Sequence, residues 1–235
     1  MSLKPFFCFY GGKWRSAPHY PPPKFGHIVE PFAGAAGYAT RYPDRSVTLI
    51  DIDPTIAALW RYLKRVSVSE VTAIPLLRAD ETVDDLRGVA EEARTLVGFW
   101  LNKGSAQPKR SQSAWMRSGI RPKSFWGEEI RNRIASQVDA IRHWTVVEGD
   151  YTLAGPERDT TTWFIDPPYQ GPVGRRYRYS DVNFIHLAAW VRARRGQVIV
   201  CENEGADWLP FRPFLATKAN ESRHGGKVSR EAIWP

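Results

Sequence analysis

The stretch Asp166-Pro167-Pro168-Tyr169 brings a carboxylate, a rigid backbone turn and an aromatic ring together. It follows the apolar run Trp163-Phe164-Ile165, which is typical of a buried strand that ends abruptly. Ligands bind just beyond the carboxyl ends of strands in open α/β sheets, so this stretch would lie where chemistry is usually done. The alternative is a strand followed by a proline-containing turn, in which Tyr169 only packs.

Composition sets the first bounds on what the chain can be. Its 235 residues are 43% apolar and carry a net charge of +8, so we expect one large domain, or a domain with an insertion, and a polyanionic partner. No run approaches the ~20 apolar residues of a membrane span, and the N-terminus lacks a signal-peptide pattern. Cys8 and Cys201 are predicted to be buried free thiols of a reducing cytosol, not a disulfide framework or metal cluster.

A loop of small residues, Ala33 to Gly37, follows a short apolar strand that ends at Glu30. Small residues let a bound ligand lie against the main chain, and we expect a helix to follow them. Gly34 and Gly37 do not supply the G-x-G-x-x-G turn of nicotinamide-binding folds. Glu30 disfavours a pyrophosphate at this loop and suits a cationic ligand.

A second predicted strand, residues 46–50, ends in Asp51-Ile52-Asp53-Pro54. Asp53 is placed to cap an amphipathic helix that begins at Pro54. Asp51 stands at the strand tip, from which an acidic side chain bonds ribose hydroxyls in nucleotide-binding folds. A cap or a solvated turn is the alternative for both aspartates, and we assign the ribose role to Asp51 alone.

From about Lys64 to His143 the alternation of strands and helices breaks down. We expect one helix over residues 82–101, with Thr82 and Asp85 spaced as a capping box. A further helix would carry four apolar residues on one face: Ile130, Ile134, Val138 and Ile141.

The segment between these helices, residues 102–126, has no acidic residue and six cations: Lys103, Lys109, Arg110, Arg117, Arg121 and Lys123. Basic side chains contact phosphates, and amides, guanidiniums and aromatics such as Trp115, Phe125 and Trp126 can contact bases. The segment therefore predicts nucleic-acid binding, and the alternative is a solvated flexible loop.

The β–α alternation then resumes. We expect strands at residues 144–148, 163–165 and 197–201, a helix around 184–191, and a closing strand near Ala232–Trp234. The loop after Tyr169 holds three arginines beside the proposed site: Arg175, Arg176 and Arg178.

Taken together and in order, these motifs resemble the Dam-type DNA adenine methyltransferases, which use S-adenosylmethionine. The resemblance runs over most of the chain. Its segments are Tyr10-Gly-Gly-Lys13, Glu30-Pro-Phe-Ala-Gly-Ala-Ala-Gly37, Asp51-Ile-Asp53, Phe99-Trp-Leu-Asn-Lys103, Asp166-Pro-Pro-Tyr169 and residues 223–233.

The resemblance implies an α/β, Rossmann-like class I methyltransferase fold with a mixed, mostly parallel, doubly wound sheet. Residues 1–65 and 128–235 would form the catalytic domain, and residues 66–127 an inserted helical and basic target-recognition region. The expected cofactor is S-adenosylmethionine, and the expected product is N6-methyladenine in DNA.

The resemblance also implies roles for single residues. The Asp166 carboxylate and the Pro167 carbonyl would accept hydrogen bonds from the amino group of a flipped adenine, and Tyr169 would stack on the base. The catalytic set is Asp166, Pro167, Pro168 and Tyr169. The cofactor set is Phe9, Tyr10, Gly12, Lys13, Glu30, Pro31, Phe32, Gly34, Asp51, Ile52, Asp150, Tyr151 and Asp166. The six cations of residues 102–126 and the three arginines after Tyr169 would bind DNA.

Two departures from the family pattern matter. Ala36 stands where the family usually has glycine, and this change narrows the approach to the methionine part of the cofactor unless Gly37 compensates. The segment after Lys103 is short and does not match the family's usual hairpin, which leaves the target sequence open.

Other readings stay open at this point: an RNA adenine or DNA cytosine-N4 methyltransferase, or a DNA-binding relative without activity. The expected partner is double-stranded DNA, with no membrane and no metal, in a monomer or weak dimer. The expected location is the cytoplasm of a bacterial or phage-infected cell.

Overall fold

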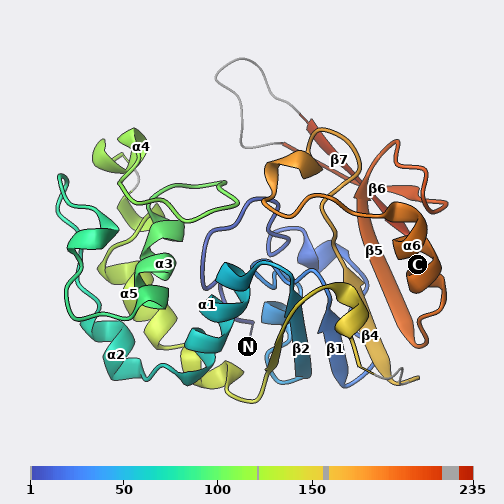
Figure 1. Cartoon of the computed structure of the whole chain (residues 1–235), viewed down its shortest axis with the longest axis horizontal. Helices are drawn as coiled ribbons and strands as arrows, with labels where there is room; N and C mark the ends of the chain where they lie inside the picture. The colour runs from blue at the N-terminus through green and yellow to red at the C-terminus, as the bar shows by residue number, and fades with distance from the viewer. Residues whose placement is uncertain (1, 121, 156–158, 219–227, 235) are drawn as a thin grey trace.

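The computed structural model describes residues 2–120, 122–155, 159–218 and 228–234. Within these ranges, seven strands form one sheet, and apolar clusters lie on both of its faces. Helices cover the sheet, and a helical region lies at one side of it (Figure 1). None of the helices in the described ranges is long and apolar enough to cross a membrane. The chain is therefore an α/β protein, as predicted.

The sheet has the strand order β3-β2-β1-β4-β5-β7-β6. The first five strands in this order run parallel to one another. They are β1 (His27–Glu30), β2 (Ser46–Asp51), β3 (Thr145–Glu148), β4 (Thr161–Ile165) and β5 (Gln197–Asn203). The strand order reverses between β1 and β4, so the crevice beyond their carboxyl ends is the topological switch point at which such sheets bind ligands.

The remaining strands form an antiparallel edge. The predicted closing strand is β7 (Val228–Trp234), which pairs with β5. β6 (Arg212–Lys218) pairs with β7 and was not anticipated, since it contains Pro213, a residue that argues against a strand except at an edge. The sheet is thus mixed and mostly parallel, as expected.

Helix starts follow their local signals. Asp53 caps α1 (Pro54–Arg65) as predicted, with its side chain accepting a 2.9 Å hydrogen bond from the Thr55 N–H. The helix predicted around residues 184–191 is α6 (Phe184–Arg192), which lies between β4 and β5 in the chain. The helix expected after the small-residue loop was a wrong prediction, because the chain forms only a 3-10 turn, Ala39–Arg41, before Pro43 prevents a longer helix.

The two faces of the sheet follow from the alternation of side chains along each strand. Ile28 and Phe164 pack with α1 in the larger core, while their neighbours Val29 and Trp163 pack with α6 on the other face. Cys201 is buried in the larger core and Cys8 is partly buried against it; both are free thiols.

Three helices of the insertion and the helix that directly follows it lie together at one side of the molecule (Figure 1). They are α2 (Val68–Ala73), α3 (Glu91–Trp100), α4 (Ala114–Arg117) and α5 (Glu128–Ala135). The helix predicted over Ile130–Ile141 divides into α5 and a 3-10 turn, Val138–Ile141, although all four of its apolar residues are buried.

The helix predicted over residues 82–101 was wrong in its first half. The Thr82–Asp85 capping box is present but starts a 3-10 turn of only three residues, Val83–Asp85. Val83 N–H bonds to Arg110 O (2.9 Å), and Gly88 has a φ of 70°, so the backbone leaves the helix before α3 begins. Tertiary pairing thus overrides the local signal.

The insertion shares the larger core with the sheet. The indole N–H of Trp100 donates to Phe6 O at 2.9 Å, and the rings of Phe99 and Phe7 lie 5.1 Å apart. Packing is therefore continuous between residues 66–127 and the N-terminal segment, which also contributes to the site described next.

Candidate active site

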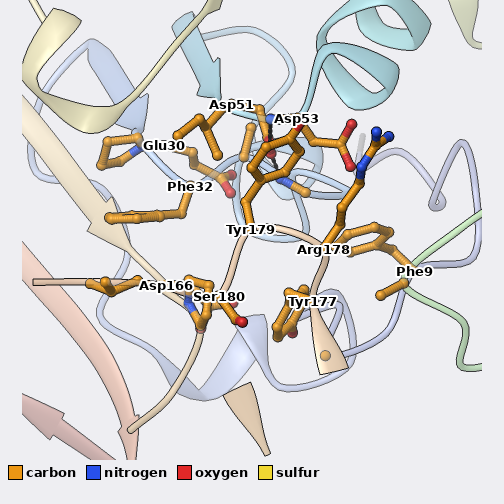
Figure 2. A pocket seen from close by; sticks show the side chains of 18 of the residues that line it. Phe9, Glu30, Phe32, Asp51, Asp53, Asp166, Tyr177, Arg178, Tyr179 and Ser180 are labelled. Atoms are coloured by element: carbon orange, nitrogen blue, oxygen red, sulfur yellow. Dashed lines mark hydrogen bonds between the residues drawn. The ribbon is translucent and has the colours of Figure 1, made fainter. Parts of the chain in front are cut away.

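A cavity of about 560 Å³ lies at the carboxyl ends of the parallel strands, within the size range of small-molecule and cofactor sites. Glu30 ends β1, Asp51 ends β2, and Asp166 directly follows β4, so neighbouring strands bring these three carboxylates to one edge. Figure 2 shows Glu30, Phe32 and Asp166 on one side of the view, and Phe9 and Arg178 on the other. The structure thus brings together the candidate residues of four separate motifs.

The charge of the cavity wall is strongly unbalanced. Two basic residues line it, Lys13 and Arg178, against six acidic residues: Glu30, Asp51, Asp53, Asp150, Asp166 and Asp181. Low-dielectric walls of one sign attract ligands of the opposite sign. The cavity therefore favours a cationic ligand and disfavours a pyrophosphate.

Lys13 and Asp166 form a buried ion pair within this wall. Lys13 Nζ lies 2.9 Å from Asp166 Oδ1 and donates a 3.1 Å hydrogen bond to Gly11 O. Burial by itself would lower the pKa of Lys13, but Asp166 and then Glu231 raise it overall. Burial raises the pKa of Asp166, and the charge of Lys13 opposes that rise. The pair keeps Lys13 as an ammonium and favours an ionised Asp166.

Tyr169 faces the interior, unlike the base-stacking position expected for it. Its ring packs against the larger core and has Lys13 Nζ 4.8 Å from its centroid. Its hydroxyl is buried and lies close enough to lower the pKa of Asp166. No hydrogen bond of normal geometry joins the two groups. Pro168 lines the cavity, and Pro167 is buried.

The carboxylates of Glu30 and Asp51 both accept hydrogen bonds from backbone amides in or just after the small-residue loop. Ala39 N–H donates to Glu30 Oε1 (2.5 Å), and Gly34 N–H donates to Asp51 Oδ2 (2.8 Å). Burial raises the pKa of Glu30 to about 8 and that of Asp51 to about 6. Asp51 also accepts the Asp53 N–H (2.9 Å), so its ribose role remains a prediction that would use its remaining lone pairs.

Ala36 has a φ of 47°, a left-handed conformation that glycine adopts without strain. This conformation explains why glycine suits the position, and it costs an alanine roughly 1 kcal/mol. Ala33, Gly34, Ala35 and Gly37 line the cavity, whereas Ala36 is fully buried in the core. Ala36 is therefore not part of the cavity wall, and its effect on the cofactor stays a prediction.

Gly37 also allows a close backbone contact that its sequence pattern does not indicate. A β-carbon at Gly37 would lie 2.5 Å from Trp14 N and 2.8 Å from Lys13 N. The absence of a side chain lets the small-residue loop contact the N-terminal backbone directly, and this contact positions Lys13 beside Asp166.

Aromatic side chains form another part of the cavity wall. The rings of Phe32 and Tyr151 lie 5.3 Å apart, and the Tyr151 hydroxyl is 2.6 Å from His186 Nδ1. Ile52 lines the cavity while 46% exposed. Asp150 lines it too and caps the next turn by accepting the Thr152 N–H (2.8 Å). These planar and apolar groups suit a purine ring.

The loop that follows Tyr169 returns over the cavity, a feature that sequence reasoning missed. Residues 177–183 line the cavity. The Tyr177 hydroxyl donates to Tyr10 O (3.1 Å), and a β-carbon at Gly11 would lie 2.1 Å from that hydroxyl. The Tyr-Gly-Gly-Lys motif therefore uses Gly11 to admit Tyr177, while Phe9, Tyr10 and Gly12, which are predicted to bind the cofactor, line the cavity.

The cations predicted to bind DNA are exposed where the structure describes them, but several have partners. Arg110 pairs with Asp84, and Lys123 Nζ lies 3.4 Å from Glu129 Oε2. Arg117 bonds to Gln112 O. Acidic residues from outside the segment thus pair with some of its cations, which the sequence of the segment does not indicate. Arg121 lies outside the described residues.

The aromatic residues of this segment also differ from expectation. Phe125 and Trp126 are 2% and 4% exposed, so they cannot contact bases, whereas Trp115 in α4 is 52% exposed. Of the three arginines after Tyr169, Arg178 lines the cavity and Arg176 lies over the Tyr10 ring at 5.1 Å. Arg175 is exposed at the surface.

No protein-family model matches the chain, and comparison with curated proteins gives no match either. Among the described residues, no group of three or more His, Cys, Asp or Glu side chains is placed to hold a metal ion. The function has to be inferred from the geometry and chemistry of the cavity itself.

Proposed function

We propose that the protein is an S-adenosylmethionine-dependent DNA methyltransferase that modifies the N6 amino group of adenine. The observation that carries the proposal is the acid-lined cavity at the switch point of the sheet, with Asp166 in its wall. The mixed sheet with its antiparallel edge is in keeping with the class I methyltransferase fold expected from the Dam-type resemblance.

The donor set of the cavity fits this cofactor. S-adenosylmethionine carries a sulfonium, an ammonium, one carboxylate and a purine, so it is a net cation, and it lacks the phosphates that this acidic wall would repel. Phe32, Ile52 and Tyr151 would hold the adenine, and Asp51 would bond the ribose. Glu30, at the end of β1, would face the cationic part.

When bound, the cofactor supplies an electrophilic methyl group. The chain's own residues align and activate the acceptor, since such a displacement needs orientation and exclusion of water more than an acid or base. Asp166 would accept one hydrogen bond from the adenine amino group and the Pro167 carbonyl a second. Both bonds favour a more tetrahedral nitrogen and stabilise its developing positive charge.

The expected base-stacking residue needs revision in this proposal. Tyr169 packs inward beneath Lys13, so in this conformation it supports the ion pair instead of offering an open face to a base. Tyr177 and Tyr179 line the cavity from the loop above it and are better placed to contact an entering base.

A nucleic-acid substrate is supported by the insertion. Lys103, Lys109, Arg110 and Arg117 are exposed on it, together with Trp115. Tyr10 N–H bonds to Ser105 O (3.1 Å), and Ala106 lines the cavity, so the basic segment runs from the cavity wall to the surface. Such a segment could direct a strand towards Asp166.

The deciding experiment is transfer of labelled methyl groups to duplex DNA, single-stranded DNA and RNA, with digestion to nucleosides to identify the product. We expect N6-methyladenine in duplex DNA. Label in RNA or in cytosine would replace the proposal with one of the two rival methyltransferases. Cofactor binding without transfer to any substrate would instead support an inactive relative.

A further inference from the structure

Glu30 is a second buried carboxylate beside Asp166, and the proposed function as stated gives it no chemical step. Its side chain is 2% exposed and lines the same cavity. It ends β1, whose Val29 pairs with Trp163 of the neighbouring strand β4. Lys13 pairs with Asp166, whereas the hydrogen bond to Glu30 Oε1 comes from a neutral backbone amide, Ala39 N–H.

The proposed reaction removes the positive charge of the sulfonium and one proton of the amino group. The methyl–sulfur bond breaks and a methyl–nitrogen bond forms, so the sulfonium becomes a neutral thioether. The amino nitrogen then loses one proton. The positive charge of the sulfonium thus passes to the amino nitrogen with the methyl group and leaves that nitrogen as one proton, which a base must accept.

Two of the buried ionisable groups at the cavity wall are poor acceptors. Lys13 is already protonated, because Asp166 raises its pKa despite burial. Protonation of Asp166 would leave the buried Lys13 ammonium without its partner, a state that is strongly unfavourable. None of the ion pairs between described residues includes Glu30, so its protonation leaves no buried cation without its partner.

We propose that Glu30 exchanges the proton of this site: it releases one when the cationic cofactor binds, and it accepts the proton lost by the amino group once the sulfonium is gone. This inference rests on the proposed function. It adds to that function a proton-exchange role for the carboxylate that also accepts the Ala39 N–H.

The electrostatics of the cavity agree with this role. Burial raises the pKa of Glu30 to about 8, and Asp166 adds to that rise while Lys13 and backbone amides oppose it. Tyr38 also interacts with Glu30; it is fully buried and its pKa is raised, so it stays neutral. A cation entering the cavity favours the ionised form of Glu30, and its removal favours the protonated form.

The test is calorimetric binding of S-adenosylmethionine at pH 7 in two buffers that differ in ionisation enthalpy. A group with a pKa of about 8 is mostly protonated at pH 7, so wild type should release close to one proton per site, about 0.9. The neutral product S-adenosylhomocysteine should release far fewer. Glu30→Gln should release none with S-adenosylmethionine, while the exposed control Glu148→Gln should match wild type.

Equal binding enthalpies for wild type in both buffers would overturn the inference, as would undiminished proton release by Glu30→Gln. If that variant fails to fold, equal proton release by the sulfonium and thioether ligands of wild type would overturn it instead. Absence of S-adenosylmethionine binding by wild type would be a different result, because it would refute the proposed function and the inference with it.

Discussion

Lys13 Nζ lies 2.9 Å from Asp166 Oδ1, in a pair whose side chains are 6% and 18% exposed. The N-terminal segment thus supplies the cation for a carboxylate that lies more than 150 residues later in the chain. Removal of one partner leaves the other charge in a poorly solvated position, which typically costs 3–5 kcal/mol.

We therefore expect Asp166→Asn to lower the free energy of unfolding by roughly 3 kcal/mol and to lower methyl transfer by about 10²-fold or more. The double variant Lys13→Met/Asp166→Asn should recover most of the stability and none of the activity. Urea denaturation and the labelled-methyl assay measure the two effects. A stable single variant with normal turnover would refute both roles of Asp166.

Gly37→Ala tests whether the small-residue loop positions Lys13. The added β-carbon would meet Trp14 N at 2.5 Å and Lys13 N at 2.8 Å, so we expect a loss of about 1–3 kcal/mol in unfolding free energy and a larger loss of activity. Gly26→Ala is the matched control, because a β-carbon there meets no atom within 4 Å. Equal stability of the two variants would show that the loop can move away at little cost.

The pH dependence of stability tests the buried carboxyl groups. Glu30 has a pKa of about 8 and Asp51 of about 6, both above their usual values of 4.5 and 3.8. The folded protein therefore binds more protons than the unfolded chain between these values, and the free energy of unfolding falls as pH rises from about 4 to about 8.

Glu30→Gln should remove most of this fall above pH 6, as measured by urea denaturation of the cofactor-free protein at pH 5, 6, 7 and 8. A single site contributes at most about 1.4 kcal/mol per pH unit. A variant whose stability follows the wild-type curve at every pH would show that Glu30 titrates normally.

Lys109 tests the basic segment as a nucleic-acid contact. It is exposed, and no acidic partner of Lys109 occurs among the described residues, in contrast to Arg110 beside Asp84. We expect Lys109→Gln to reduce the slope of log affinity against log salt by about 0.9, the effect of one phosphate contact.

Lys24→Gln is the control for Lys109, since this exposed lysine precedes β1 at the amino edge of the sheet, opposite the cavity. Its slope should equal that of wild type. If Lys109→Gln also keeps the wild-type slope, the segment around it is a solvated loop and does not contact the nucleic acid.

The sequence predicts the strands and strand ends well because their signals are local. Trp163-Phe164-Ile165 followed by Asp166 predicts both the end of β4 and a site there, and Asp53-Pro54 marks the start of α1. The small-residue loop could be located for the same reason. Its wrong helix prediction arose because Pro43 and the contact at Gly37 limit the backbone after the loop.

Long-range packing accounts for what could not be predicted. The loop over the cavity is held by the bond from Tyr177 to Tyr10, which lie 167 residues apart. An aromatic residue beside cations has the same sequence pattern whether it is buried, as Trp126 is, or exposed, as Trp115 is. The inward position of Tyr169 beneath Lys13 likewise depends on a segment more than 150 residues away.

The shared core of the insertion has a consequence for protein engineering. The indole of Trp100 donates to Phe6 O, and Tyr10 N–H donates to Ser105 O. The N-terminal segment and the insertion therefore each satisfy polar groups of the other. A chimera that exchanges residues 66–127 alone would lose the Trp100 indole that bonds to Phe6 O and the Phe99 ring that packs on Phe7, and it would open a cavity there unless the new residues replace both. Grafts made to alter the proposed nucleic-acid contacts should therefore transplant residues 6–10 together with the insertion.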